Sequence, residues 1–192
     1  MDPLNIIVGL NIIAIFGANI GAAKKGIRSH IGETKERPKG FFQTVPPLLA
    51  TLLLVMLIIA LFQVGTFTEY AKWQPYRLAG LLFYLVSSWT QVALYRRLGD
   101  NYSQDIVIFK KHKLIQDGLY KYIRHPYYLF QILSDLGAAV ATLSFLVLPL
   151  AVIEIPILIK RALIEEGLLE KHFPEQFKQY RKKAGFFLPF IG

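Results

Sequence analysis

The sequence predicts an all-α integral membrane protein with about five transmembrane helices, and three observations support this fold class. More than half of the 192 residues are hydrophobic. Apolar regions long enough to cross a bilayer follow one another along the chain. The basic residues gather between these regions rather than inside them. Cysteine is absent, which excludes disulfides, thiolate nucleophiles and cysteine-ligated metal centres.

The first three apolar regions are each long enough for one membrane-spanning helix, which needs about 20 residues. They are Pro3–Ala23, Val45–Phe67 and Pro75–Tyr95. Proline is tolerated at the first positions of a helix. Pro46 therefore predicts the start of the second helix, together with Pro47, and Pro75 predicts the start of the third.

The fourth apolar region, Pro126–Ile159, is too long for one crossing and too short for two crossings joined by an ordinary loop. It predicts a tight helical hairpin that turns within Ala141–Pro149 and has a cytoplasmic cofactor pocket at its C-terminal side. Residues 161–183 read as a helix that leaves the membrane and is interrupted near Phe173-Pro174. The apolar residues 185–191 are expected to pack back on the site or on the bilayer surface.

Five crossings place nearly all of the positive charge on one side of the membrane. The segments 24–44, 96–124 and 160–183 hold every Lys and Arg except Lys72 and Arg77. The positive-inside rule then predicts an external N-terminus and a cytoplasmic C-terminus. Four crossings would put the last basic segment on the wrong side. Because these cations flank apolar spans, membrane lipids explain the net charge of +9 better than nucleic acid does.

The chain therefore divides into two predicted regions. Residues 1–95 form three transmembrane helices with a basic loop at 24–44, and residues 96–192 form the catalytic region. The second region comprises a connector, the hairpin, a C-terminal helix and a tail. Ionisable groups next to apolar spans are costly unless paired, so a functional site is expected there.

The first group of such residues is Arg124-His125-Pro126, with Tyr128 on roughly the same helical face as His125. Pro126 at the first helical position leaves the opening N–H groups free at the positive end of the helix dipole, which suits an anion. Arg124 adds a permanent forked cation. The alternative is a basic anchor that contacts lipid phosphates, with His125 as the helix cap.

The second group lies at the end of the hairpin. Arg161 and Glu165 are four residues apart, Glu154 falls on the same face, and Glu166 points about 100° away. The simpler interpretation is an exposed ion pair worth about 0.3–0.5 kcal/mol. Together the two groups have the charges needed to grip a small zwitterion at a membrane face. Asp135 is expected to hydrogen-bond to a neighbouring helix.

Other candidate residues carry weaker signals. His112 and Lys113 precede Leu114-Ile115 and a turn, so they form either one wall of a nucleotide pocket or a solvated loop. His30 and His172 are predicted to be isolated surface residues. No histidine spacing matches a metal site, so no metal is expected, and Rossmann, phosphate-loop and nucleophile-elbow motifs are absent.

The order Gly118-x-Tyr120, Arg124-His125-Pro126-x-Tyr128, an apolar hairpin and Arg161-x-x-x-Glu165-Glu166 resembles the isoprenylcysteine carboxyl methyltransferase family. Phospholipid N-methyltransferases share a looser version of this pattern. The similarity covers about residues 98–191, and the first three spans match only in hydropathy and length. The resemblance implies an integral membrane enzyme that uses S-adenosyl-L-methionine (SAM).

The resemblance also implies residue roles. His112 to Ile115 and Tyr120 would surround the adenosine, and His125 and Tyr128 would contact the methionine part. Glu165 would hold the ammonium group, and Arg161 would face the acceptor. The implied catalytic residues are Arg161 and Glu165, and the implied cofactor-binding residues are His112, Lys113, Leu114, Ile115, Tyr120, Arg124, His125, Pro126, Tyr128, Glu165 and Glu166. Asp105 stands where eukaryotic members carry Gln, which leaves its role open.

The expected reaction is methylation of a carboxylate on an isoprenylcysteine-like or lipid-like acceptor that enters from the bilayer. A carboxylate is already ionised at neutral pH, and Arg161 can orient it through forked hydrogen bonds. N-methylation of a phospholipid amine and S-methylation of a small thiol are alternatives on the same scaffold. A non-catalytic lipid-binding scaffold is the alternative from another class, and a membrane reductase is a more distant one.

Overall fold

The computed structural model describes residues 2–30 and 34–192, and only the backbone of residues 20–30. The side chains of Lys24, Lys25, Arg28 and His30 therefore lie outside the described residues. The helices are α1 (Pro3–His30), α2 (Phe41–Leu61), α3 (Gln74–Leu98), α4 (Pro126–Thr142), α5 (Val147–His172) and α6 (Pro174–Lys183). Short elements lie between them: strands β1 (Thr34–Glu36) and β2 (Ile108–Phe109), and 3₁₀ turns η1 (Gly99–Asn101) and η2 (Gly118–Lys121).

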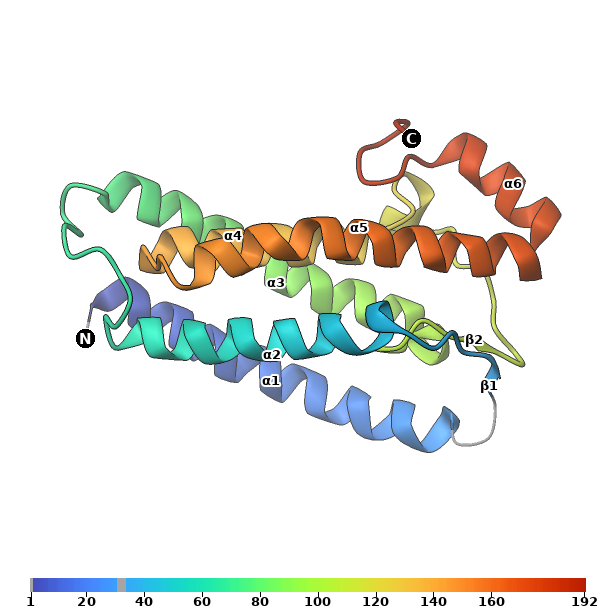
Figure 1. Ribbon diagram of the computed structural model, residues 1–192, viewed down its shortest axis with the longest axis horizontal. Coiled ribbons are helices and arrows are strands. Elements are labelled where there is room, and N and C mark those ends of the chain that lie inside the picture. Colours follow the sequence, from blue (N-terminus) through green and yellow to red (C-terminus); the bar gives the residue numbers. More distant parts are fainter. Residues whose placement is uncertain (1, 31–33) are drawn as a thin grey trace.

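Five long helices extend along the molecule, and α6 leaves the end of α5 to lie beside the bundle (Figure 1). The predicted hairpin is confirmed as α4 and α5. Leu143 ends α4 in a left-handed conformation, with φ of 50°. The Ser144 hydroxyl then accepts hydrogen bonds from the N–H groups of Leu146 and Val147 and so starts α5. The predicted interruption at Phe173-Pro174 is also confirmed.

The ends of the first two helices differ from the prediction. Helix α1 continues to His30, beyond the predicted end at Ala23. Helix α2 begins at Phe41 and ends at Leu61, so Pro46 and Pro47 lie inside it and the prediction that they mark its start is wrong. Gly40, whose φ of 137° is accessible to glycine, precedes the helix. Proline inside a helix leaves a carbonyl four residues earlier without its usual partner.

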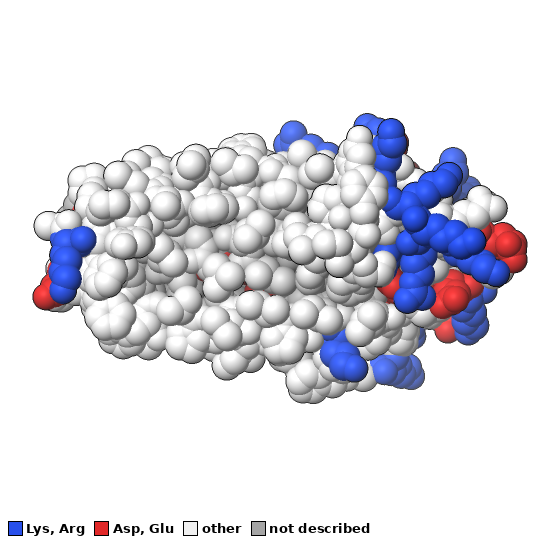
Figure 2. Space-filling view, turned by 90° about the horizontal axis from the view of Figure 1, so that it is seen from above, with Lys and Arg blue, Asp and Glu red and all other residues white. Residues whose placement is uncertain are grey.

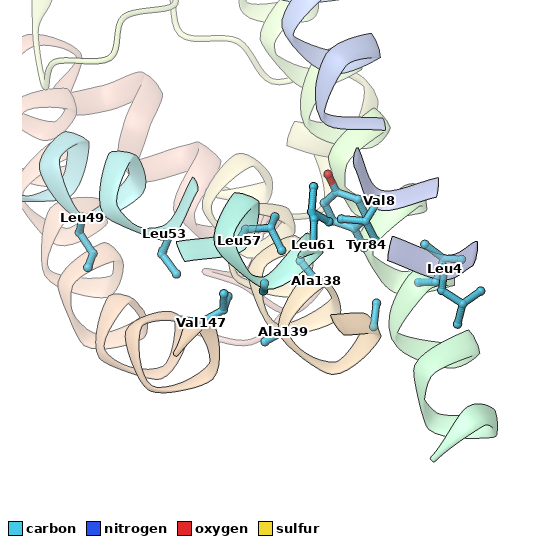
Figure 3. Packing of buried hydrophobic residues seen from close by; sticks show 14 residues of the cluster. Leu4, Val8, Leu49, Leu53, Leu57, Leu61, Tyr84, Ala138, Ala139 and Val147 are labelled. Carbon is cyan, nitrogen blue, oxygen red and sulfur yellow. The ribbon is translucent and has the colours of Figure 1, made fainter. Parts of the chain in front are cut away.

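The core lies where α2 meets the hairpin. Leu49, Leu53, Leu57 and Leu61 recur every four residues along α2, form one apolar stripe, and pack in one cluster with Val147 (Figure 3). This packing holds the hairpin against the N-terminal helices and thereby sets the position of its open end.

A close crossing of α3 and α4 also fixes the position of the hairpin. A Cβ atom added to Gly137 would lie 2.7 Å from the backbone N of Tyr84 and 2.8 Å from the carbonyl oxygen of Gly80. Two glycines therefore allow the backbones to approach without an intervening side chain. Because α4 carries His125 at its start, this contact also positions the candidate site.

The far end of the bundle is held by a buried ion pair. Arg77 is fully buried and donates to both carboxylate oxygens of Asp2, at 2.6 and 3.1 Å, and to the carbonyl of Ala141 at 2.9 Å. The hydrogen bond from Arg77 holds the pKa of Asp2 below its usual range. The chain before α1 is thus joined to α3 and α4 at the end opposite the candidate site.

The surface has the charge distribution expected beside a bilayer. Figure 2 shows Lys and Arg gathered at one end of the visible face, a smaller charged group at the other, and a largely uncharged band between. Within the described chain, two helices are long and apolar enough to cross a membrane, Phe41–Leu61 and Gln74–Asn101, and Pro3–Asn19 is a shorter apolar helix. The five-crossing topology and its orientation stay predictions.

Candidate functional site

The start of α4 and the end of α5 meet, as the sequence predicts. Nε of Arg124 lies 2.6 Å from Oε1 of Glu166, and Nε2 of His125 lies 3.0 Å from the same oxygen. Nδ1 of His125 is 3.9 Å from Oε2 of Glu165. Residues about forty positions apart therefore form one charged group at the charged end of the bundle.

Glu166 is held inside this group by its partners. Burial disfavours its charge, but the hydrogen bonds from His125 and Arg124 outweigh burial and hold the pKa of Glu166 below its usual range. Arg124 also donates to the carbonyls of Ala184 and Gly192, the latter at 3.0 Å. Because Arg124 is buried and its guanidinium contacts Glu166 and the tail, the alternative of an anchor that contacts lipid phosphates is wrong.

The C-terminal tail covers this group, and the expectation that it packs back on the site is confirmed. The N–H groups of Arg124 and His125 donate to the carbonyls of Gly185 and Phe186, at 2.8 and 3.2 Å. The Phe186 ring centroid lies 5.0 Å from that of His125. His125 precedes α4 but makes no side-chain cap hydrogen bond, so its ring remains directed to the acids of α5.

Tyr128 joins the two residues assigned to catalysis. Its hydroxyl donates to Oε2 of Glu165 at 3.1 Å and accepts from Nε of Arg161 at 3.1 Å. The described side chains include no direct ion pair between Arg161 and Glu165, so the predicted exposed ion pair is wrong. The ring of Tyr128 stacks on His125 with centroids 5.9 Å apart, which aligns both with the acids.

Arg161 is buried and held by main-chain oxygens. Nη1 donates to the carbonyl of Phe42 at 2.9 Å, and Nη2 donates to the carbonyl of Gln104. The amino-acid sequence indicates neither of these partners, because a main-chain carbonyl has no residue-specific signal. The one available indication was Pro46, which removes the helical donor to Phe42.

The adjacent acids Glu165 and Glu166 differ in how accessible their carboxylates are to a ligand. The Glu165 side chain is 39% exposed, whereas that of Glu166 is 6% exposed. Both contacts of Glu165 are made through Oε2, so its other oxygen remains accessible to a ligand. Of the two carboxylates, Glu165 is therefore the one suited to bind a positive group.

The segment that begins at His112 packs at the corner between α5 and α6. The His112 ring lies 6.0 Å from that of Phe173, and Leu114 packs in a cluster with Phe177. Phe173 follows Glu165 by eight residues, about 12 Å along a helix axis. Lys113 is exposed and Ile115 is half-buried. This segment therefore lies further along α5 than Glu165 and Glu166. His112 and Leu114 are the residues through which it packs on the corner between α5 and α6.

His112 is neutral at physiological pH. Burial, aided by the nearby His172, lowers the pKa of His112 to about 4. His172 is not the isolated surface residue that the sequence predicts, because its Nε2 lies 2.7 Å from a carboxylate oxygen of Glu36. Strand β1, which carries Glu36, is thereby attached to the end of α5.

Three buried side-chain atoms of the described residues have no hydrogen-bond partner: Nδ1 of His112, the hydroxyl of Tyr120 and Oε2 of Glu154. Buried polar atoms are normally paired. The first two belong to residues that the family resemblance assigns to the adenosine. Burial raises the pKa of Tyr120, and the charge of Glu165 raises it further. The phenol is therefore a neutral group available to hydrogen-bond to a ligand.

The other acids that the sequence singles out, Asp105, Glu154 and Asp135, have local partners. Asp105 pairs with Arg37 at 2.6 Å, near the surface. Glu154 accepts a hydrogen bond from Gln131 at 2.6 Å, and Asp135 of α4 contacts Glu154 of α5, which confirms the expected contact with a neighbouring helix. In the part of the chain that is described, no three His, Cys, Asp or Glu side chains are grouped so that they could hold a metal ion.

Known proteins share both the sequence pattern and the fold. Residues 76–176, just over half of the chain, match the phospholipid methyltransferase family. Protein-S-isoprenylcysteine O-methyltransferase of Schizosaccharomyces pombe is 32% identical over 83 residues, which is 43% of this chain and 35% of that protein. The chain thus matches about a third of that relative's length.

A solved structure of the eukaryotic intramembrane Ras methyltransferase ICMT (isoprenylcysteine carboxyl methyltransferase) has a similar fold. The TM-score is 0.57 at 20% sequence identity, over 76% of this chain and 52% of that one. The family match includes α4, the turn after it and α5, and therefore both halves of the charged group around His125. This chain belongs to the phospholipid methyltransferase family.

Proposed function

We propose that this protein is a membrane-embedded SAM-dependent methyltransferase that O-methylates the carboxylate of an isoprenylcysteine-like or lipid-like acceptor. The observation that carries the proposal is the accessible carboxylate of Glu165 beside a buried, fully positioned Arg161. One offers a site for an ammonium group, and the other offers a site for an acidic acceptor.

The residues present fit the cofactor. The free oxygen of Glu165 suits its ammonium group, and the first turn of α4 offers N–H groups to its carboxylate. The unpaired atoms of His112 and Tyr120 suit the hydrogen-bonding groups of a nucleoside. When bound, SAM supplies an electrophilic methyl group on a sulfonium centre.

Arg161 has the donors needed to orient an acceptor. A guanidinium carries five N–H donors, and contacts with Tyr128, Phe42 and Gln104 each use one nitrogen. The remaining donors can hold a carboxylate in a defined direction. Because that carboxylate is already ionised, the protein has to align it and exclude water rather than remove a proton.

A second candidate is N-methylation of a phospholipid amine, which the description of the matching family favours. An amine has to lose a proton before it can accept a methyl group and would gain little from Arg161. Methylation of a small thiol is a further alternative on this scaffold. A non-catalytic lipid-binding scaffold would have no use for the unpaired atoms of His112 and Tyr120.

Cofactor binding tests the proposal first. Calorimetry on the full chain in detergent should show saturable SAM binding. Glu165→Gln should weaken it by about tenfold or more, because a charge-assisted hydrogen bond is worth about 1.5–3 kcal/mol. Glu170→Gln is the matched control, since Glu170 is an exposed acid of the same helix. No SAM binding by the parent protein would reject the enzyme in favour of a scaffold.

The product tests the acceptor. Labelled SAM would be incubated with a prenylated cysteine analogue, a phospholipid amine or a small thiol. Release of the label by mild base identifies a methyl ester, whereas methylated amines and thiols retain it. Transfer only to the amine or the thiol would reject O-methylation while leaving the SAM-dependent reaction in place.

A further inference from the structure

A basic pocket lies beside the charged group, between η2, α6 and the C-terminal tail. It has a volume of about 540 Å³. A glutamine, three lysines and three aromatic residues line it, and these lysines and aromatics are Lys121, Lys182, Lys183, Tyr122, Tyr180 and Phe190. None of the residues assigned above to the cofactor or the acceptor belongs to this lining. The pocket is therefore a separate feature of the same end of the molecule.

The three lysines have no acidic partner among the described residues. The ion pairs of the described chain engage other cations, such as Lys171 with Glu36 and Arg97 with Asp117. Lys121 instead lies 5.6 Å from the ring of Tyr122. Three like charges around one pocket repel one another. An anion in the pocket would relieve this repulsion, so the lining favours a negatively charged ligand.

The aromatic side chains give the pocket a fixed wall and an apolar rim. Tyr180 is buried and donates from its hydroxyl to the carbonyl of Tyr120 at 2.6 Å. Tyr122 and Phe190 meet edge to face, with centroids 6.4 Å apart. Phe190 is 75% exposed. The rim thus offers apolar surface immediately next to the lysines.

The tail extends this apolar surface. Leu188 and Ile191, on either side of Phe190, are both exposed. Exposed apolar side chains interleaved with lysines are typical of protein surfaces that contact anionic lipid headgroups. In Figure 1, α6 and the tail lie at the side of the helix bundle rather than beyond its end. Such a position is compatible with contact with the headgroup layer.

We propose that this pocket binds the phosphate group of an anionic lipid headgroup. The ammonium groups of Lys121, Lys182 and Lys183 pair with the phosphate. Phe190 and its exposed neighbours in the tail contact the adjoining part of the lipid. A free phosphate would meet the same lysines but would leave the apolar rim without a partner, and this difference favours the lipid.

Direct binding to the full chain in non-ionic detergent tests the site without a methyl donor. The probes are dioctanoyl phosphatidylglycerol, dioctanoyl phosphatidylcholine and inorganic phosphate, with native mass spectrometry as the measurement. The test variant is K121Q/K182Q/K183Q. The matched control is K110Q/K111Q/K178Q, which removes three exposed lysines outside the pocket. All six side chains are exposed, so both variants should fold.

Phosphatidylglycerol should bind the parent protein more tightly than either other probe. A lysine near a lipid phosphate contributes roughly fivefold in affinity, so the test variant should lose about 100-fold. The control variant should stay within about threefold of the parent. Phe190→Ala should weaken phosphatidylglycerol but leave inorganic phosphate unchanged, because only the lipid reaches the apolar rim.

Three results would overturn the assignment. Equal loss of phosphatidylglycerol in the two triple variants would show non-specific attraction to the charged end. Equal affinity for inorganic phosphate and phosphatidylglycerol would identify a free-phosphate site. Displacement of the lipid by a glutamate-rich peptide at lower concentration than phosphatidylglycerol itself would point to an acidic protein partner.

Discussion

Arg161 donates a hydrogen bond to the main-chain carbonyl of Phe42, 2.9 Å away. The carbonyl is available because Pro46, four residues further along α2, has no N–H group to donate to it. A proline inside one helix thus supplies an acceptor for a buried cation on another. This contact connects α2 to the residues assigned to catalysis.

Pro46→Ala should therefore impair the site without destabilising the helix. Alanine restores an N–H donor that competes with Arg161 for the Phe42 carbonyl. Loss of one hydrogen bond to a charged group corresponds to about tenfold. We expect kcat/KM for methyl transfer to fall by about that factor, while Tm stays unchanged or rises. Pro47→Ala is the control, because Pro47 frees the carbonyl of Gln43 instead. Equal losses in the two variants would contradict the role of the Phe42 contact.

Tyr128→Phe should remove the hydroxyl that connects Glu165 to Arg161 through hydrogen bonds. The variant keeps the ring stacked on His125 but leaves Glu165 and Arg161 without their shared partner. SAM affinity should fall by about threefold to tenfold, and kcat/KM should fall further. Calorimetry and initial rates would measure the two effects.

Tyr127→Phe is the matched control for this substitution. The Tyr127 hydroxyl lies 3.2 Å from that of Tyr102 and contacts neither assigned catalytic residue. It should stay within about threefold of the parent in both measurements. If Tyr128→Phe also stayed within that range, its hydroxyl would have no part in the site.

The stability of the protein should fall as the pH drops from about 6.5 toward 4, in part through His112. The pKa of His112 is lowered from 6.5 to about 4 in the folded protein, by burial first and then by His172. In this window the unfolded chain binds a proton that the folded chain does not, so acid favours unfolding. The acid that contacts this pair of histidines is Glu36, which pairs with His172. His112→Leu should flatten the dependence of Tm on pH in this window. An unchanged slope would count against this contribution of His112.

Gly137→Ala should destabilise the crossing of α3 and α4. The added methyl group would meet backbone atoms of Tyr84 and Gly80 at 2.7 and 2.8 Å, and backbone cannot move aside as a side chain can. Overpacking of this kind costs about 1–3 kcal/mol. Thermal unfolding in detergent should show a lower Tm. Gly167→Ala is the control, because a Cβ atom there has nothing within 4 Å, and it should be neutral or stabilising. Equal Tm values for the two variants would argue against a tight crossing.

Much of the fold could be predicted because its signals are local. Pro75 and Pro126 open α3 and α4, and the break before Pro174 ends α5. The beginning of α2 could not be predicted in this way. Its two prolines resemble a helix start, but a distant arginine stabilises one of the carbonyls that they expose. The effect of Pro46 depends on Arg161, which lies 119 positions from Phe42 in the sequence.

The sequence by itself determined the helical segments, the basic flanks and the side chains available for the site. The approach of His125 to Glu165 was also predictable. The motif that contains them consists of two short segments, and within each segment the important residues are close neighbours in sequence. Only the tertiary structure decided that Glu166 is held by Arg124 while Glu165 remains accessible. It also decided that Arg161 is held by main-chain oxygens. These choices depend on distances between segments far apart in the chain, which neither residue type nor helical periodicity specifies.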